Sequence, residues 1–410
     1  MAHSTSTEKR LSNARSDGWR LGALALLAVW IMAPVTLPVP VLRELVGERF
    51  AVSEFATSLF MSVNMIGALL MAPLAGAFSD RWGRKRSLLV VALAVDAGCF
   101  FGLAAPVPFW GFLAIRFVEG CAHITALSVL LMLASRALPA EHRGRAMGAV
   151  GGSMMIGVAL GAPLGGLLGQ SSTLLPLYVG GALALIAALL AAATVADDSE
   201  YDERPGMHAI VKALRTHPRL CIPLAFAFAD RFTVGFFTTT FSLYARRIHS
   251  LSPAEIGMSI AIFMIPFAIL SYPFGRMAER VSIPVLLCGG SVIYGLGTAA
   301  VGFVGPPELN GLMFAIGISA AVMFVPSMIM TTQIAPDEIR ATALGAFNAA
   351  GSLGFIIGPL AGGAISQLVA ADWGWPSGYQ AAFIVAGVSE MLCVVITLPF
   401  LMRGNSATRP

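Results

Sequence analysis

Apolar residues in this chain fall in long unbroken runs, separated by short stretches in which polar and charged residues collect. Each run is close to the roughly 20 residues that a helix needs to cross a bilayer. Backbone amides inside lipid must be satisfied within their own segment, so we expect helices rather than strands. The predicted spans are 19–42, 55–78, 88–105, 108–136, 145–169, 174–196, 220–245, 255–275, 283–304, 309–334, 342–369 and 379–402.

The connections between these runs alternate in charge. One set carries almost all of the basic residues, and the opposite set carries only Arg43, Arg49, Arg246 and Arg247. Basic loops stay on the cytoplasmic side of a membrane. We therefore predict a multi-pass protein of a bacterial-type inner (cytoplasmic) membrane, with both termini in the cytoplasm.

The first half of the chain recurs in the second. A pattern of Pro, Glu, Arg, Ala and Gly that begins at Pro139 returns 197 residues later from Pro336. A repeat unit with an even number of helices returns to the same side of the membrane, which gives parallel halves. We expect an all-α membrane protein with twelve transmembrane helices in two pseudo-symmetric six-helix bundles. The predicted bounds are 1–196 for the first bundle, 197–219 for a cytoplasmic linker and 220–410 for the second bundle.

Composition supports the membrane assignment and excludes several classes of function. Of the 410 residues, 57% are hydrophobic and only 12% are charged, whereas soluble domains carry about 25% charged residues. The five cysteines lie singly in apolar stretches, so we expect neither a metal nor a redox site. We find no hydrolase, phosphate-binding or metal motif, and we predict no enzyme activity and no cofactor. Topology accounts for the basic residues, so nucleic-acid binding is not expected.

Ionisable residues inside the spans are the candidates for function, because charge at membrane depth is costly unless it is paired or hydrated. In the span 108–136, Arg116, Glu119 and His123 share one helical face. Glu119 lies about 16 Å along this helix, near the bilayer midplane. We expect Glu119 to exchange a proton, Arg116 to hold a counter-charge or an anionic substrate group, and His123 to relay protons. The alternative is a static Arg116–Glu119 pair that only fastens helices together.

Four more ionisable residues lie at membrane depth. Asp230 and Arg231 are neighbours about 15 Å into their span. Adjacent helical residues point about 100° apart, so we expect one to face a cavity and the other a neighbouring helix. A bundle-internal ion pair is the equally open alternative. Asp96 is a second candidate proton site, and Glu390 is expected to make a structural pair. The span 309–334 offers only soft polar or polarizable candidates, namely Ser319, Met323, Ser327, Thr331, Thr332 and Gln333.

The connection after the second span reads GAFSDRWGRKR from Gly76. It resembles the cytoplasmic motif GxxxDRxGRR/K of the major facilitator superfamily, and the resemblance extends over essentially the whole chain. Such a charge cluster can act as a latch that closes the inner gate in one state; a role in topology alone is the alternative. The second-half copy, GRMAER from Gly275, lacks the later Gly-Arg-Lys run, so we expect a weaker latch. The resemblance implies gating roles for Gly76, Asp80, Arg81, Gly83, Arg84, Glu279 and Arg280.

The span 145–169 contains Gly157, Gly161, Pro163 and Gly165. This arrangement resembles the fifth-helix motif of the family's proton-coupled exporters, displaced by the extra Ala162. Closely spaced glycines let helices pack backbone to backbone, and a proline bends the helix. We therefore expect these residues to form a helix-packing motif, and the resemblance favours export.

The family's fourth-helix motif has an arginine followed by a polar residue and a glycine. Arg116 and Gly120 match it, and Glu119 stands in the polar position. The resemblance also implies that the first, fourth, seventh and tenth helices line the transport path.

We predict a monomeric secondary transporter that exports small organic compounds by proton-coupled antiport and alternating access. Its expected partners are a small-molecule substrate, protons and membrane lipid. One alternative is an importer or facilitator of an organic anion held by Arg116 and Arg231; another is a sensor or assembly factor without transport.

Overall fold

The structure is a computed structural model, and it describes the chain over residues 2–82, 85–138, 143–195, 207–278, 280–336 and 339–406. Within these ranges only the backbone is described for 2–17, 73, 75–82, 143–144, 207–211, 341 and 403–406. Every regular element in this part of the chain is helical, and no strand occurs in it.

The first bundle contains α1 (Ala2–Thr36), α2 (Glu54–Trp82), α3 (Lys85–Ala104), α4 (Phe109–Arg136), α5 (Arg143–Ser171) and α6 (Leu175–Thr194). Between α1 and α2 the chain makes a 3-10 turn, η1 (Val39–Val41), and a π-helical turn, η2 (Arg43–Glu48). Helix α1 packs on α5 and α6, α2 packs on α4, and α3 packs on both α4 and α6.

The second bundle contains α8 (Cys221–Thr238), α9 (Thr240–Ile248), α10 (Pro253–Met277), α11 (Ile283–Ala300), the 3-10 turn η5 (Val301–Phe303), α12 (Pro306–Ile334) and α13 (Arg340–Ser406). Helices α8 and α9 form one membrane crossing interrupted at Thr239, whose φ of −131° and ψ of −68° are not helical. Helix α13 contains two crossings joined at Gly374, whose φ of 81° lies in the left-handed region that glycine adopts readily. Helix α8 packs on α13, α10 on α12, and α11 on both α12 and α13.

A short helix, α7 (Met207–Thr216), and a 3-10 turn, η4 (Pro218–Leu220), precede the second bundle. Helix α7 lies in the predicted linker 197–219 and η4 spans its end; residues 197–206 of the linker lie outside the described residues. Leu214 of α7 packs against a cluster of Leu220, Ala335 and Ala343 in the second bundle. The exact bundle bounds at 196 and 220 stay a prediction.

Eleven segments of the described chain are long and apolar enough to cross a membrane. The last of them, Thr342–Met402, has 61 residues, and Gly374 divides it into two crossings. Most of the crossings match the predicted spans closely, as Ile283–Phe303 does for 283–304. The predicted fold class is confirmed: the protein has twelve transmembrane helices in two six-helix bundles.

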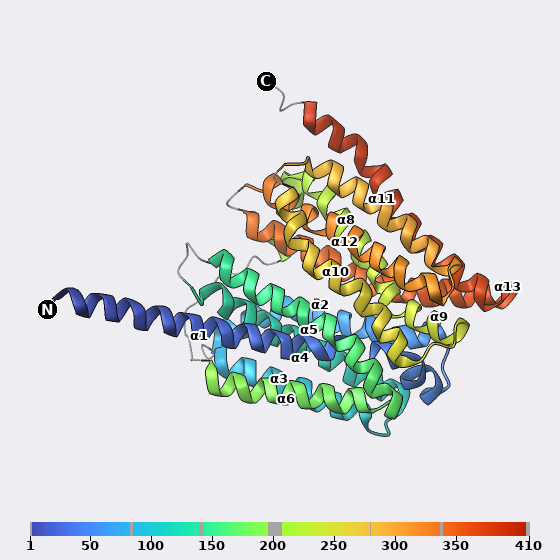
Figure 1. Cartoon of the computed structure of the whole chain (residues 1–410), viewed down its shortest axis with the longest axis horizontal. Helices are drawn as coiled ribbons and strands as arrows, with labels where there is room; N and C mark the ends of the chain where they lie inside the picture. Colours follow the sequence, from blue (N-terminus) through green and yellow to red (C-terminus); the bar gives the residue numbers. More distant parts are fainter. Residues whose placement is uncertain are drawn as a thin grey trace.

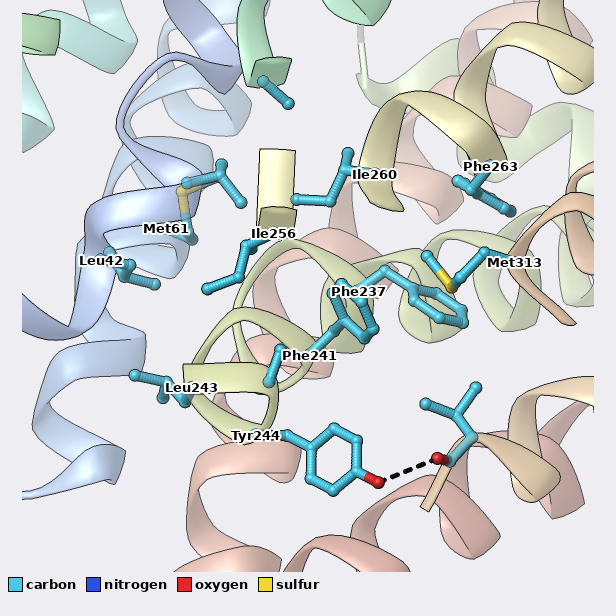
Figure 2. Packing of buried hydrophobic residues seen from close by; sticks show 14 of the residues in the cluster. Leu42, Met61, Phe237, Phe241, Leu243, Tyr244, Ile256, Ile260, Phe263 and Met313 are labelled. Atoms are coloured by element: carbon cyan, nitrogen blue, oxygen red, sulfur yellow. Dashed lines mark hydrogen bonds between the residues drawn. The ribbon is translucent and has the colours of Figure 1, made fainter. Parts of the chain in front are cut away.

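The two bundles lie side by side, and both chain ends leave the molecule on the side away from α9 (Figure 1). Across the bundles, α5 packs on α10 and α2 packs on α13. Near α9, Leu42 and Met61 of the first bundle lie in one core with Phe237, Ile256 and Ile260 of the second (Figure 2). We call this the sealed end, defined by η1, η2, α9 and the first turn of α10.

Local sequence fixes where α10 begins at the sealed end. Ser252 Oγ accepts a hydrogen bond from the Glu255 N–H, and the Glu255 carboxylate accepts one from the Ser252 N–H at 2.7 Å. This reciprocal capping box satisfies two backbone donors, and Pro253 suits the first helical turn because it has no N–H to lose. The start of α10 is therefore held firmly where it meets the first bundle.

Candidate functional site

The predicted residues on α4 form a buried ion pair that reaches a neighbouring helix. Arg116 Nη1 lies 2.5 Å from Glu119 Oε2, and the two side chains are only 1% and 2% exposed. Asn64 of α2 donates its side-chain N–H to the same carboxylate oxygen. Arg116 Nε donates to the Phe60 carbonyl at 3.2 Å, and the guanidinium lies 4.2 Å from the Phe60 ring centre. Arg116 and Glu119 therefore neutralise each other and join α4 to α2 in this conformation.

His123 and Asp96 extend this cluster to α3. His123 Nδ1 lies 3.5 Å from Asp96 Oδ2, and both residues are buried. Asp96 Oδ1 has no hydrogen-bond partner among the described residues. The ligand atoms of Asp96, Glu119 and His123 lie within 4.8 Å of one another, a donor set that could hold a metal ion. The Arg116 guanidinium opposes this, because it already contacts Glu119 and would repel a second positive charge.

Arg231 on α8 is held between two aromatic rings. Its guanidinium carbon lies 5.3 Å from the centre of the Phe324 ring on α12 and 5.4 Å from that of Phe347 on α13. Its Nη1 atom is buried and has no hydrogen-bond partner in the described part of the chain. A Cβ added at Gly351 would overlap the guanidinium, so this glycine makes the space for it. Arg231 thus differs from Arg116, which has an acidic partner.

Asp230 lies in a different environment from Arg231, although the two are adjacent. Asp230 is 8% exposed and interacts electrostatically with Arg231, and also with Glu390 and Tyr294. Glu390 is fully buried on α13, where the Thr233 hydroxyl lies 3.4 Å from its carboxylate and the Ser291 side chain also interacts with it. Sequence reasoning expected a structural pair for Glu390; the described residues give it these hydroxyl partners and no basic group within ion-pair distance.

The structure brings the predicted residues together in two separate clusters. Glu119, Arg116, His123 and Asp96 share one cluster in the first bundle, while Asp230 and Arg231 belong to the second bundle. The hydrogen-bond, ion-pair and ring partners described here for each cluster come from its own bundle. Sequence reasoning missed Asn64 and the two rings around Arg231. A lone asparagine in an apolar span was the one available signal for Asn64.

An apolar pocket lies between the bundles below the sealed end. Phe237 and Phe263 stack in its wall with ring centres 5.3 Å apart, and Figure 2 shows them beside Ile260 and Met313. The break in the seventh crossing at Thr239 follows the wall residues directly. Interrupted helices near the midplane often form solute sites in transporters. The pocket is lined by Thr36, Val39, Phe237, Thr238, Ile260, Phe263, Met264 and Met313.

Ion pairs and hydrogen bonds between the bundles hold the sealed end together. Arg246 of α9 pairs with Glu44 of η2. Arg247 Nε lies 2.9 Å from Glu54 Oε1, an ion pair without hydrogen-bond alignment. The Tyr379 hydroxyl donates to the same Glu54 carboxylate, which is almost fully buried. Sequence reasoning noted the two arginines only as exceptions in the charge pattern and did not predict their partners.

Two further contacts complete this end of the molecule. The Ser242 hydroxyl donates to the Val39 carbonyl at 2.6 Å, which joins α9 to η1. His249 Nε2 lies 2.8 Å from the Tyr244 hydroxyl, and desolvation lowers the pKa of His249 below its ordinary value. A lowered pKa keeps this imidazole neutral at neutral pH, so it adds no charge to the ion pairs around it.

The glycines predicted to pack helices lie along the contact between α5 and α1. A Cβ at Gly157, Gly161 or Gly165 would overlap the backbone carbonyl of Val29, Ala33 or Leu37 respectively. The repeat carries the same arrangement to the second bundle. There Gly354 and Gly358 approach the carbonyls of Phe228 and Phe232, and Gly362 approaches the Thr240 hydroxyl.

In each copy of this glycine motif, on α5 and on α13, the next glycine contacts the opposite bundle. A Cβ at Gly166 of α5 would overlap the Pro253 carbonyl of α10, and one at Gly363 of α13 would overlap the Ser58 hydroxyl of α2. Pro163 lies within α5, which continues through it.

The predicted gating motifs fall largely outside what the structure describes. Gly83, Arg84 and Glu279 lie outside the described residues. Gly76, Asp80 and Arg81 lie on the last turns of α2, where only the backbone is described. Arg280 is described and exposed, just after α10.

Comparison with known proteins identifies relatives over almost the whole chain. The family model described as Major Facilitator Superfamily matches residues 21–245 and 224–410. Multidrug resistance protein 2 of Bacillus subtilis (strain 168) is 23% identical over 400 residues, which cover 94% of each chain. The multi-drug resistance efflux pump PmrA homolog of Lactococcus lactis subsp. lactis (strain IL1403) is 25% identical over 364 residues, or 85% of each chain.

The fold agrees with solved structures of transporters. A bacterial homolog to the human lysosomal transporter Spinster, in an inward-facing and unoccupied conformation, superposes with a TM-score of 0.79 at 14% identity. The match covers 93% of this chain and 96% of that one. With a family model that spans both bundles, the chain belongs to the Major Facilitator Superfamily.

Proposed function

We propose that this protein exports small organic compounds in exchange for protons, by alternating access between its two bundles. The observation that carries the proposal is the buried cluster of Glu119, Arg116 and Asn64, continued by His123 and Asp96. Ionisable side chains at this depth are energetically costly, and in membrane proteins they commonly mark a path for protons, ions or substrate. The names of the multidrug-resistance relatives support export as the direction.

Proton binding at Glu119 would change the balance of charge in this cluster. The carboxylate offsets the Arg116 charge and accepts from Asn64. A proton on Glu119 would leave Arg116 without its counter-charge and weaken the contact between α4 and α2. A ligand shifts a two-state equilibrium only by its difference in affinity for the two states, and this change supplies such a difference. Asp96 and His123 are the proposed relay.

The proposed orientation places the termini in the cytoplasm, by the positive-inside pattern of the loops. The sealed end then faces the outside, and the conformation is inward-facing. We further propose that the motif around Asp80 and Arg81, with the weaker copy at Glu279 and Arg280, latches the cytoplasmic side when the outer side opens. The ion pairs of Arg246 and Arg247 would break in that state.

Flux in proteoliposomes tests the proposal. With an imposed pH gradient, Glu119→Gln is expected to abolish pH-driven transport while the protein still folds, because glutamine keeps a hydrogen-bond acceptor for Asn64 but cannot exchange a proton. Glu308→Gln is the matched control, since Glu308 is an exposed acid in the first turn of α12. Unchanged pH-driven flux in Glu119→Gln would remove Glu119 from the mechanism.

The second candidate is an importer or facilitator of an organic anion that uses Arg116 and Arg231. The Nη1 atom of Arg231, which has no partner among the described residues, favours it. The Glu119 partner of Arg116 weighs against the part assigned to Arg116. Uptake that does not depend on pH and is lost in Arg116→Lys would favour this candidate over the exporter.

A further inference from the structure

Arg231 is an intramembrane cation without an acceptor for one of its buried donors. Its Nη1 has no hydrogen-bond partner among the described residues, and no carboxylate lies within ion-pair distance of it there. Buried donors are almost always satisfied in proteins, and a charged one left without a partner is especially costly. Asp230 interacts with it only as a nearby charge, from the next position along the helix. A missing acceptor is therefore the simplest account of this site.

The surroundings of Arg231 define the shape of what could supply that acceptor. The rings of Phe324 and Phe347 flank the guanidinium, which packs directly against Gly351. The Arg231 residue is only half-buried, so part of it remains accessible. A planar guanidinium between rings presents a fork of donors suited to a carboxylate.

A row of aromatic side chains leads from this guanidinium to the apolar pocket. Phe324 contacts Phe267 with ring centres 5.6 Å apart, and Phe267 stacks on Phe263 at 6.4 Å. Phe263 stacks in turn on Phe237 in the pocket wall, at 5.3 Å. Phe267 and Phe324 are half-buried, while Phe263 and Phe237 are buried beside Ile260 and Met313 (Figure 2). The row thus joins a cation at one end to an apolar recess at the other.

We propose that Arg231 and this aromatic row bind amphipathic aromatic organic anions, with the carboxylate on Arg231 and the aromatic body along Phe324 and Phe267 toward the pocket. Stacked rings favour an aromatic over an aliphatic body. This assignment rests on the proposed function and names its substrate class. Arg116 takes no part in it, because Glu119 already neutralises that charge.

Equilibrium binding in lipid nanodiscs tests the assignment without any need for transport. The probe is 2-naphthoate, whose own fluorescence reports binding, compared with neutral 2-naphthamide and with non-aromatic cyclohexanecarboxylate. We expect naphthoate to bind at least about tenfold more tightly than naphthamide, because the amide lacks the charge that pairs with Arg231. We also expect it to bind more tightly than cyclohexanecarboxylate, which keeps the charge but cannot stack on the aromatic row. Equal binding of naphthoate and naphthamide by the unmodified protein would overturn the assignment, and this comparison needs no variant.

Variants then assign the binding to the named residues. Arg231→Gln is expected to raise the Kd for naphthoate about tenfold to a hundredfold and to leave naphthamide binding unchanged. Phe324→Leu should raise the Kd for naphthoate and leave that for cyclohexanecarboxylate unchanged. Arg219→Gln, an exposed arginine at the start of the same crossing, is the matched control. Naphthoate affinity that survives Arg231→Gln would place the anion elsewhere.

The two proposals fail separately in these experiments. Naphthoate binding that depends on Arg231, without pH-driven flux of any compound, would refute the proposed antiport and leave the anion site standing. Flux of cationic or neutral compounds driven by pH, with no naphthoate binding or competition, would refute the anion site and leave the antiport standing.

Discussion

Arg116 is among the largest fully buried side chains of the protein, and its charge is offset by Glu119 one turn away. Removing one partner of a buried pair leaves the other charge uncompensated, which typically costs about 3–5 kcal/mol. We therefore expect Arg116→Ala to lower the thermal unfolding midpoint of the purified protein sharply. Glu119→Gln in the same chain should restore much of the loss, because it removes the orphaned charge. A double variant no more stable than Arg116→Ala would show that the pair is not the source of the effect.

At the scale of residues, the sequence predicts which side chains are candidates for function but not which residues they contact. Spacing alone put Arg116, Glu119 and His123 on one face of a helix, and the structure shows this cluster. Asn64 could not be predicted as the second ligand of Glu119, because its position depends on how α2 packs against α4. Close packing there requires Gly120, where a Cβ would overlap the Asn64 carbonyl. The pattern of glycines does not specify the partner helix.

At the scale of elements, the glycine rows decide how closely the helices approach. Gly161→Val is expected to destabilise the fold by about 1–3 kcal/mol or more, because the side chain would overlap α1 at Ala33. Gly152→Val, on the same helix, has nothing within reach of its Cβ and is the matched control. The yield of monodisperse protein on gel filtration and its unfolding temperature measure the difference. Equal behaviour of the two variants would contradict the packing role.

Length and hydropathy predicted the crossings well, because the bilayer fixes how long an apolar helix must be. The break at Thr239 was not predicted, since no proline or glycine marks it and the helix resumes directly. The join between the last two crossings was expected as a connection after residue 369. The structure instead continues the helix as far as the left-handed Gly374, and it resumes after that single residue.

At the scale of the molecule, the ion pairs at the sealed end hold the two bundles in the arrangement that the structure shows. Arg247→Gln together with Arg246→Gln removes the basic partners of Glu54 and Glu44. We expect these changes to open that end more often. In a background without the five native cysteines, Ser242→Cys reports the opening, because Ser242 is 1% exposed. Its labelling by a membrane-impermeant thiol reagent should become several-fold faster. Unchanged labelling would mean that apolar packing alone holds the seal.

The sequence could not indicate which conformation the structure would adopt. Both states of an alternating-access protein have the same residues, and their free energies differ by only a few kcal/mol. The internal repeat predicted two related bundles, but it does not determine the angle at which they pack against each other. That angle depends on contacts such as Tyr379 with Glu54, which join residues 325 positions apart.

Gly166 and Gly363 occupy equivalent places in the repeat, and each lies directly against the opposite bundle, at the Pro253 carbonyl and the Ser58 hydroxyl respectively. A single methyl group at either place would force the two bundles apart at the sealed end. At Gly363 it would also crowd the backbone of Glu54, the partner of Arg247. Gly166→Ala and Gly363→Ala should therefore each speed the labelling of Ser242→Cys, and together they should enrich the opposite conformer enough to isolate it. The internal repeat thus places one glycine on each side of the contact between the bundles, and the lack of a Cβ at both positions lets the sealed end close.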